Sequence, residues 1–239
     1  MLFASSYTHY VFLCNGELWA CGNNDKGQLG LGNTDRAESP IMVDYDFGLY
    51  GIKSIKCNVF NTIVLTNDGK VYTTGLTVMD NIDNKFKYTT TFTLVNLSGN
   101  VQHIDINGFY IFAIIDAELY FWSNNHQAYV YPRKMEIGSI KNLYCNSDSN
   151  SIIITDDDKL WLFSIAYTDD NDIHRIDSFQ YSYYPSYIII GFVNDESGSP
   201  GLLIKCNEVD FIISPFYSPD QSFHIQSSEK VIIRQHKIF

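Results

Sequence analysis

The segment from Gly16 to Asn33, GELWACGNNDKGQLGLGN, constrains the fold more than any other part of the chain. The Asn15-Gly16 pair at its start favours a tight hairpin turn. Residues 18–20, Leu-Trp-Ala, have the apolar and aromatic character of a strand, which Cys21 and Gly22 close. We therefore predict a β-hairpin that ends at Gly22.

The second half of this segment predicts a tightly bent loop. Three glycines let the backbone adopt conformations closed to other residues: Gly27, Gly30 and Gly32. Leu29 and Leu31 lie between them, so two apolar side chains can point into a core. Pro40 then ends the loop, and residues 41–43, Ile-Met-Val, predict another strand.

With its flanks, this segment resembles a repeat of the regulator of chromosome condensation (RCC1) family. Repeats of that family carry a turn, an apolar-aromatic strand, a Trp-Gly pair, a GQLGLG-type loop and a proline. The resemblance implies an all-β fold, an RCC1-like β-propeller with one blade per repeat. Because one repeat can arise by chance, the test is recurrence at a fixed period.

The hairpin pattern recurs in decaying form at residues 57–75, 106–124, 145–164 and 201–214. Corresponding strand positions are 53, 48, 41 and 49 residues apart: Leu18, Val71, Leu119, Leu160 and Val209. These intervals fit one blade each, so we predict about five recognisable blades in a single domain over 1–239. The repeat residues are Gly16, Trp19, Gly22, Gly27, Gly30, Gly32, Pro40, Gly69, Gly75, Trp122 and Trp161.

The repeats also depart from the family pattern. Only the first keeps the glycine-rich loop, and the closing glycine of Gly22 and Gly75 becomes Ser123 and Ser164. The family typically closes a ring of seven blades, which leaves two alternatives here: a closed small ring, or an incomplete ring completed by another segment or partner. We favour closure, because an open arc leaves an exposed strand edge. The strand expected at 230–238 would then pair with one from the first 21 residues.

Charge narrows the class of partner. The chain has 16 basic and 27 acidic residues and a formal net charge of −11, so duplex nucleic acid is not expected as a direct ligand. The prototype of the family binds nucleosomes and promotes nucleotide exchange on a small nuclear GTPase, but a basic tail for chromatin is missing here. Protein partners with basic surfaces fit better; alternatively, the charge serves only solubility.

The motifs of catalysis and cofactor binding are missing from the sequence. Five scattered cysteines lack a CxxC pair, six histidines lack metal-ligand spacing, and GQLGLG lacks the Lys-Ser or Lys-Thr of a phosphate loop. We read the acidic stretch 168–177 as a solvated loop between blades. We expect no enzyme activity, no cofactor and no metal, and, without a signal peptide or an apolar run of membrane length, a cytoplasmic or nuclear location.

Two functions remain open at this point. One is a non-catalytic protein–protein interaction module, a scaffold whose loops between strands bind a partner. The alternative, implied by the resemblance, is a guanine-nucleotide exchange factor for a small GTPase. The candidate partner-binding residues lie in the loop Asn23–Arg36, which alone keeps the full pattern: Asp25, Lys26, Asp35 and Arg36. The competing interpretation is that this loop only satisfies turn geometry.

Overall fold

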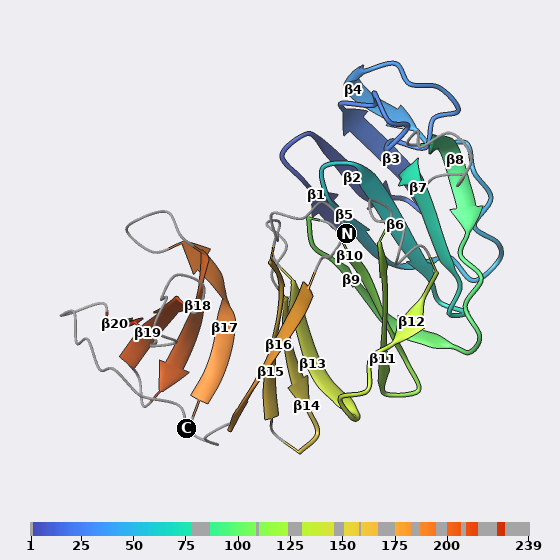
Figure 1. Cartoon of the computed structure of the whole chain (residues 1–239). Helices are drawn as coiled ribbons and strands as arrows, with labels where there is room; N and C mark the ends of the chain where they lie inside the picture. Colours follow the sequence, from blue (N-terminus) through green and yellow to red (C-terminus); the bar gives the residue numbers. More distant parts are fainter. Residues whose placement is uncertain are drawn as a thin grey trace.

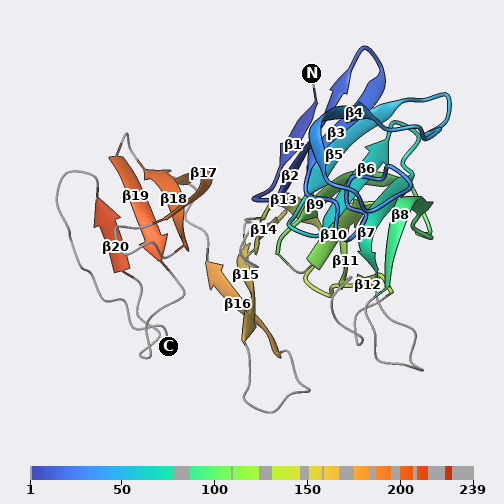
Figure 2. The same cartoon turned by 90° about the horizontal axis from the view of Figure 1, so that it is seen from above.

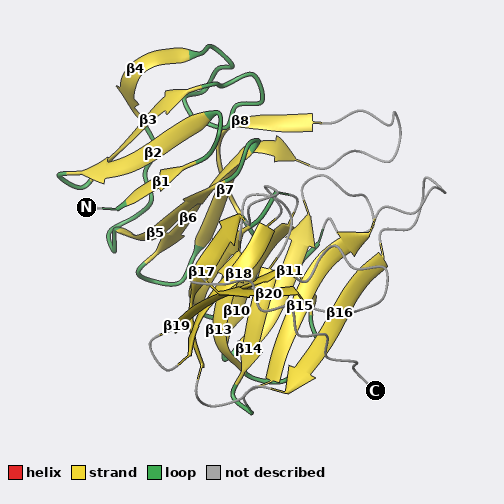
Figure 3. Ribbon diagram, turned by 90° about the vertical axis from the view of Figure 1, so that its left-hand side faces the viewer, coloured by secondary structure: helices red, strands yellow, loops and turns green. Residues whose placement is uncertain are grey.

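The computed structural model describes residues 2–77, 87–108, 110–123, 131–145 and 151–157. Beyond Asp157 it describes the backbone of six strands, within 159–166, 175–182, 187–194, 200–206, 209–214 and 224–227. Every regular element in these parts of the chain is a strand (Figure 3).

The described strands form five four-stranded antiparallel sheets, which follow one another along the chain, each built from four consecutive strands. The first sheet is β1 (Phe3–Ser5), β2 (His9–Cys14), β3 (Glu17–Gly22) and β4 (Ala37–Met42). The second is β5 (Ile52–Cys57), β6 (Asn61–Thr66), β7 (Val71–Thr77) and β8 (Lys87–Leu94). The third is β9 (Val101–Ile106), β10 (Tyr110–Ile115), β11 (Glu118–Ser123) and β12 (Arg133–Lys134).

The last two sheets repeat this order. The fourth is β13 (Ile140–Cys145), β14 (Ser151–Thr155), β15 (Lys159–Ala166) and β16 (Arg175–Ser182). The fifth is β17 (Tyr187–Asn194), β18 (Pro200–Cys206), β19 (Val209–Ser214) and β20 (His224–Ser227). Each predicted hairpin forms the two middle strands of one sheet.

The sheets stand around an arc, with the first strand of each on its inner side (Figures 1 and 2). Strand β1 lies next to β5, β5 next to β9, and β9 next to β13. The fifth sheet lies at the opposite end of the arc from the first. The strand predicted at 230–238 falls outside the described residues, so closure of the ring stays a prediction.

Turn chemistry explains the hairpins. Asn15 and Gly16 both have positive φ, 53° and 85°, as a type I′ turn requires. Asp116 and Ala117 take the same conformation in the third sheet, with φ of 51° and 63°, although neither is a glycine. In the second sheet Gly69 supplies the positive φ, 78°.

The hydrophobic core is divided among the junctions between successive sheets. Val11, Leu18 and Leu29 of the first sheet and its loop pack against Val64 and Phe92 of the second. Aliphatic side chains fill the next junction, with Trp122 among them, and aromatic side chains of the third sheet meet Leu143 and Ile153 of the fourth. Among the described side chains, the first four sheets are therefore stabilised mainly by packing on one another.

Two sequence predictions are wrong at the outer strands. The strand expected at 41–43 begins at Ala37, so Pro40 lies inside β4 rather than before it; a proline is tolerated there because β4 is an edge strand whose pairing with β3 is irregular. The acidic stretch 168–177 is not wholly a loop, since Arg175 to Asp177 begin β16. Strand β16 is longer than expected because it pairs with β15 along the whole length of β15.

Candidate functional site

The connection between β3 and β4 is organised by a buried asparagine. The Asn24 side chain is fully buried; its Oδ1 accepts a hydrogen bond from the Leu29 amide (2.9 Å), and its Nδ2 donates to the Asn33 carbonyl (2.9 Å). Two successive turns lie between these anchors, closed by the Gly27 amide on the Asn24 carbonyl and by the Gly30 amide on the Gly27 carbonyl. One side chain thus fixes both halves of the loop.

The glycines of this loop pack directly on the second sheet. A Cβ at Gly27 would collide with the Thr89 carbonyl oxygen, and one at Gly30 would lie 2.5 Å from the Phe92 ring. The Gly32 amide donates to the Thr90 carbonyl at 2.8 Å. Close approach between sheets, together with positive φ, therefore explains Gly27 and Gly30.

Two threonine hydroxyls of the second sheet hold the loop backbone. Thr62 Oγ1 donates to the Gln28 carbonyl at 2.7 Å, and Thr74 Oγ1 donates to the Gly27 carbonyl at 2.8 Å. The Gln28 side chain is also buried, and its Nε2 donates to the Val59 carbonyl at 3.3 Å. This polar contact satisfies backbone groups that would otherwise be buried without partners.

His9 continues the same network from the first sheet. Its Nε2 lies 2.8 Å from Thr62 Oγ1. Since Thr62 gives its own proton to the Gln28 carbonyl, it accepts one from His9, which sets a neutral imidazole protonated at Nε2. Burial disfavours the charged form and lowers the pKa of His9 to about 4.

The four candidate partner-binding residues lie on the exposed side of this loop. Asp25 and Lys26 form an ion pair of 3.3 Å with side chains 59% and 38% exposed. Arg36 pairs with Glu38 at 2.7 Å, and Asp35 is exposed. The structure brings the four together on one loop, and whether they bind a partner stays a prediction.

The closing glycines have a structural role in two sheets. A Cβ at Gly22 would lie 2.6 Å from the Thr8 carbonyl oxygen, and one at Gly75 would collide with the Phe60 carbonyl oxygen. Both have positive φ, 116° and 104°. Trp122, the neighbour of the equivalent Ser123, is buried in the second junction. Trp161 pairs with Ile153 as Trp19 pairs with Phe12.

Sequence reasoning missed a relay of asparagines between sheets. Asn58 follows β5; its Oδ1 accepts from the Asn61 amide (2.8 Å) and its Nδ2 donates to the Asn107 carbonyl (3.0 Å). Asn107 follows β9, accepts from the Tyr110 amide (2.7 Å) and donates to Ser151 Oγ (3.0 Å). An asparagine directly after two successive inner strands, β5 and β9, was the available signal, and the two are 49 residues apart.

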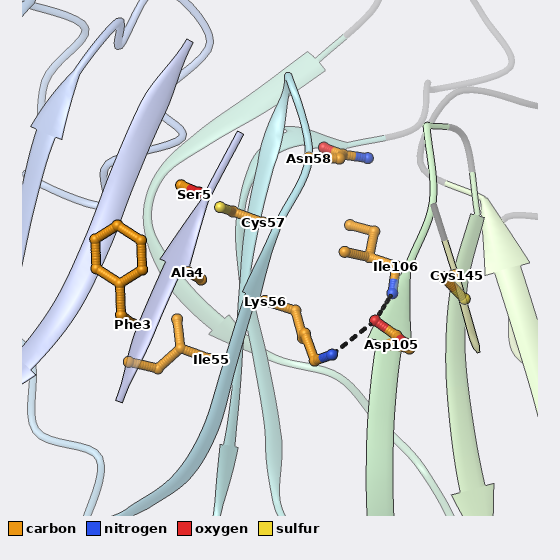
Figure 4. Close-up of a pocket in the computed structure, with 10 residues that line it drawn as sticks. All are labelled: Phe3, Ala4, Ser5, Ile55, Lys56, Cys57, Asn58, Asp105, Ile106 and Cys145. Carbon is orange, nitrogen blue, oxygen red and sulfur yellow. Dashed lines mark hydrogen bonds and ion pairs between the residues drawn. The ribbon is translucent and has the colours of Figure 1, made fainter. Parts of the chain in front are cut away.

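A cavity of about 270 Å³ opens on the inner side of the arc, lined by β1, β5, β9 and β13 (Figure 4). Lys56 Nζ and Asp105 Oδ1 form an ion pair of 2.9 Å in it. Burial raises the pKa of the Cys57 thiol to about 12 and that of Cys145 well above its ordinary value. Both sulfurs are thus protonated near neutral pH, which makes them poor nucleophiles and poor metal ligands.

Within the described ranges, no group of three or more histidine, cysteine or acidic side chains is arranged to hold a metal ion. The same ranges contain no helix that is long and apolar enough to cross a membrane.

Sequential four-stranded sheets around an arc, with the first strand of each innermost, define the β-propeller class of repeat proteins. Residues 15–65 match the family profile of the regulator of chromosome condensation (RCC1) repeat. Residues 15–65 therefore carry an RCC1 repeat, as the sequence of the first loop indicated.

Curated relatives match about a quarter of the chain. The RCC2 homologue of Danio rerio is 42% identical over 65 residues, which are 27% of this chain and 13% of the relative. The ubiquitin-protein ligase HERC2 of Mus musculus is 38% identical over 61 residues, 26% of this chain and 1% of the relative. The matched region is thus a small part of these much longer proteins.

Solved structures match most of the chain in fold. Yeast RCC1 (Prp20) bound to Kap60 gives a TM-score of 0.68 at 15% identity, over 92% of this chain and 57% of that one. Human WBSCR16 gives 0.65 at 15% identity, over 90% and 61%. These matches show an RCC1-like propeller fold, and this chain spans about three fifths of each of those chains.

Proposed function

We propose that this chain is a non-catalytic protein-interaction module of the RCC1-like propeller type, which binds a partner through the loop Asn23–Arg36. The observation that carries the proposal is the contrast between the two sides of that loop. Asn24, Gln28 and Leu29 are buried and fix its backbone, whereas Asp25 and Arg36 are exposed. A backbone fixed before binding loses little conformational entropy when a partner docks.

The partner we propose is a protein with a basic surface. The chain carries a formal net charge of −11, which attracts cationic surfaces and speeds their encounter at low ionic strength. Asp25 and Asp35 would supply the loop's carboxylates to such a partner. No cofactor is part of this proposal, and we place the complex in the cytoplasm or the nucleus.

Exchange of guanine nucleotide on a small GTPase is the second candidate. Its support is the shared fold with Prp20, a yeast RCC1 whose binding to Gsp1p and histones has been characterised. At 14% identity the likeness concerns the fold alone, and no residue of this chain can be assigned to an exchange loop. Exchange therefore stands second to simple partner binding.

The test uses charge reversal on the loop. Tagged protein is purified from its native cells at moderate salt, bound proteins are identified by mass spectrometry, and the dissociation constant of the main partner is measured. Asp25→Lys with Asp35→Lys should weaken binding by about tenfold or more, because close charge pairs across interfaces are typically worth more than about 1.4 kcal/mol.

The matched control is Glu118→Lys with Glu136→Lys, two acidic side chains on the third sheet and its following loop that are 42% and 82% exposed. It makes the same change in net charge elsewhere and should leave the dissociation constant unchanged. Equal weakening by both pairs would mean that only net charge matters and would reject the loop as the site. A captured GTPase that exchanges nucleotide faster with this protein would favour the second candidate.

A further inference from the structure

The inner strands of the sheets carry charge of the opposite sign to the chain as a whole. Together β1, β5, β9, β13 and β17 contain three lysines and one acidic residue: Lys53, Lys56, Lys141 and Asp105. Their formal net charge is therefore +2, whereas that of the whole chain is −11. Because a concave wall focuses the field of the charges that line it, the inner side of the arc favours anions (Figures 1 and 2).

Two lysines of β5 are held against β9. Lys53 Nζ donates to the Gln102 carbonyl at 2.8 Å, and Lys56 Nζ reaches across to Asp105 Oδ1 at 2.9 Å (Figure 4). His103 follows Gln102 on β9, and its side chain is exposed. Alternate residues of a strand share a face, so His103 points to the same side as Asp105. The two ammonium groups thus lie on either side of an imidazole.

The charges of the two lysines are balanced differently. Lys56 is neutralised by Asp105, whose side chain is only 11% exposed. The exposed Lys53 donates to a neutral carbonyl, and among the described residues no carboxylate forms an ion pair with it. Burial lowers the pKa of His103; Asp105 raises this pKa, and the two lysines lower it further. With a neutral imidazole near pH 7, the cluster keeps one uncompensated positive charge.

The spacing of the two ammonium groups selects the anion. Their partners on β9, Gln102 and Asp105, are three residues apart, which is about 10 Å along a strand. An anion that lies over His103 and makes a charge-assisted contact of about 2.8 Å with each lysine needs negative oxygens roughly 5 Å apart. The outer oxygens of a diphosphate reach this separation, whereas those of a single phosphate group do not.

We propose that Lys53 and Lys56, on the inner side of the arc, form a binding site for a small molecule with two linked phosphate groups. The phosphates bridge the two ammonium groups, and neutral His103 donates one ring N–H to them. The cavity of about 270 Å³ that Lys56 and Asp105 help to line gives room for a group attached to the phosphates. None of these residues belongs to the loop Asn23–Arg36, so the proposal does not depend on the proposed function.

Titration calorimetry of the 239-residue chain with inorganic pyrophosphate, at low ionic strength and without divalent metal, tests the proposal. Pyrophosphate should bind about tenfold or more tightly than orthophosphate. Lys53→Met should weaken pyrophosphate binding by about tenfold, because it removes a charged hydrogen-bond donor. Asp105→Asn should tighten it by about threefold, because it removes the carboxylate that repels the ligand.

The matched control is Lys134→Met on β12, the outermost strand of the third sheet. Its lysine is 37% exposed, and the substitution makes the same change in net charge, so the dissociation constant should stay unchanged. ADP as a second probe identifies the source of the phosphates. Tighter binding of ADP than of pyrophosphate means that the cavity holds the organic part, and equal binding means an inorganic ligand.

Acetylation of lysines in the unmodified chain, read by mass spectrometry, does not depend on how the variants fold. Pyrophosphate should slow the reaction of Lys53 and leave that of Lys134 unchanged. No binding of pyrophosphate, or no protection of Lys53 at saturation, overturns the proposal. Equal weakening by Lys53→Met and Lys134→Met also overturns it, and the inner lysines then serve only to keep the edge strands from pairing with other chains.

Discussion

The junction between the first and second sheets and the junction between the second and third are built differently at equivalent positions. Thr62 and Thr74 lie opposite each other on β6 and β7, and their hydroxyls donate to carbonyls of the glycine loop. The equivalent pair in the third sheet is Ile111 and Trp122, both buried among aliphatic side chains. The first junction is polar at this point and the second is apolar.

The sequence of the preceding loop explains the difference. The connection after β3 contains Gly27, Gly30 and Gly32, whereas residues 78–86 after β7 contain no glycine. A glycine loop that lies against the next sheet presents backbone carbonyls, and these need donors. The connection after β7 lacks the glycines, and the third sheet lacks the hydroxyl donors that such a loop would need. The two changes are therefore coupled across the second junction.

The largest effect is expected at the apolar junction. Trp122→Ala removes a side chain that is 2% exposed, and truncation of a buried tryptophan costs about 3–5 kcal/mol of unfolding free energy. Urea denaturation measures it. Tyr131→Ala, at a side chain 78% exposed, should change stability by less than about 0.5 kcal/mol. A loss below about 1 kcal/mol for Trp122→Ala would mean that the second junction does not depend on its apolar filling.

At the polar junction, Gly27→Ala should cost about 3 kcal/mol, from positive φ and from collision with the Thr89 carbonyl. Gly32→Ala separates these causes. Gly32 has the same kind of backbone, φ of 79°, but a Cβ added there would meet nothing within 4 Å, so only the conformational cost of about 1 kcal/mol remains. Equal losses in urea denaturation would show that the loop does not press on the second sheet.

The polar junction should also weaken in mild acid. Since the pKa of His9 is lowered from 6.5 to about 4 in the folded chain, the unfolded chain binds the proton first. The contribution of neutral His9 to the unfolding free energy is complete above pH 6.5 and is lost as the pH falls towards 4. Between pH 7 and pH 5 this loss is about 2 kcal/mol. His9→Gln should flatten this part of the profile; the same slope in wild type and variant would contradict the assignment.

The smallest change in unfolding free energy is expected from substitutions at two neighbouring threonines. Thr74→Val removes the donor to the Gly27 carbonyl, which keeps its bond from the Gly30 amide, so we expect a loss of about 1 kcal/mol. Thr73→Val is the matched control, because the buried Thr73 hydroxyl has no hydrogen-bond partner; its loss should be neutral or slightly stabilising. Thermal or urea unfolding that ranks the two in the opposite order would refute the hydroxyl's role.

Local chemistry made the hairpins predictable. Asn15-Gly16 and Asn67-Asp68-Gly69 specify their own turns, and short runs of apolar residues mark the strands on either side. The outer strands were harder to predict from the sequence. Strands β4 and β16 form by pairing with β3 and β15, and their own residue patterns do not specify them. That is why the start of β4 and the assignment of 168–177 were wrong.

The candidate loop was predictable in position but not in its contacts. The glycine spacing located the loop and its exposed charges, including Asp25 and Arg36. Its dependence on Thr62 and Thr74 links residues 34 and 47 positions apart in the chain, which a single sequence does not reveal. The asparagine relay was readable from Asn58 and Asn107, but only once the inner strands were known.

The packing of the glycine loop on β8 also sets an order of events during synthesis. Gly27 and Gly32 need Thr89 and Thr90 beside them, so the first sheet cannot complete its loop until about 60 more residues have left the ribosome. At about 5–20 residues per second this takes several seconds, during which the buried Asn24 and Leu29 are open to water. Early chaperone contact on the nascent chain should therefore concentrate on this first loop.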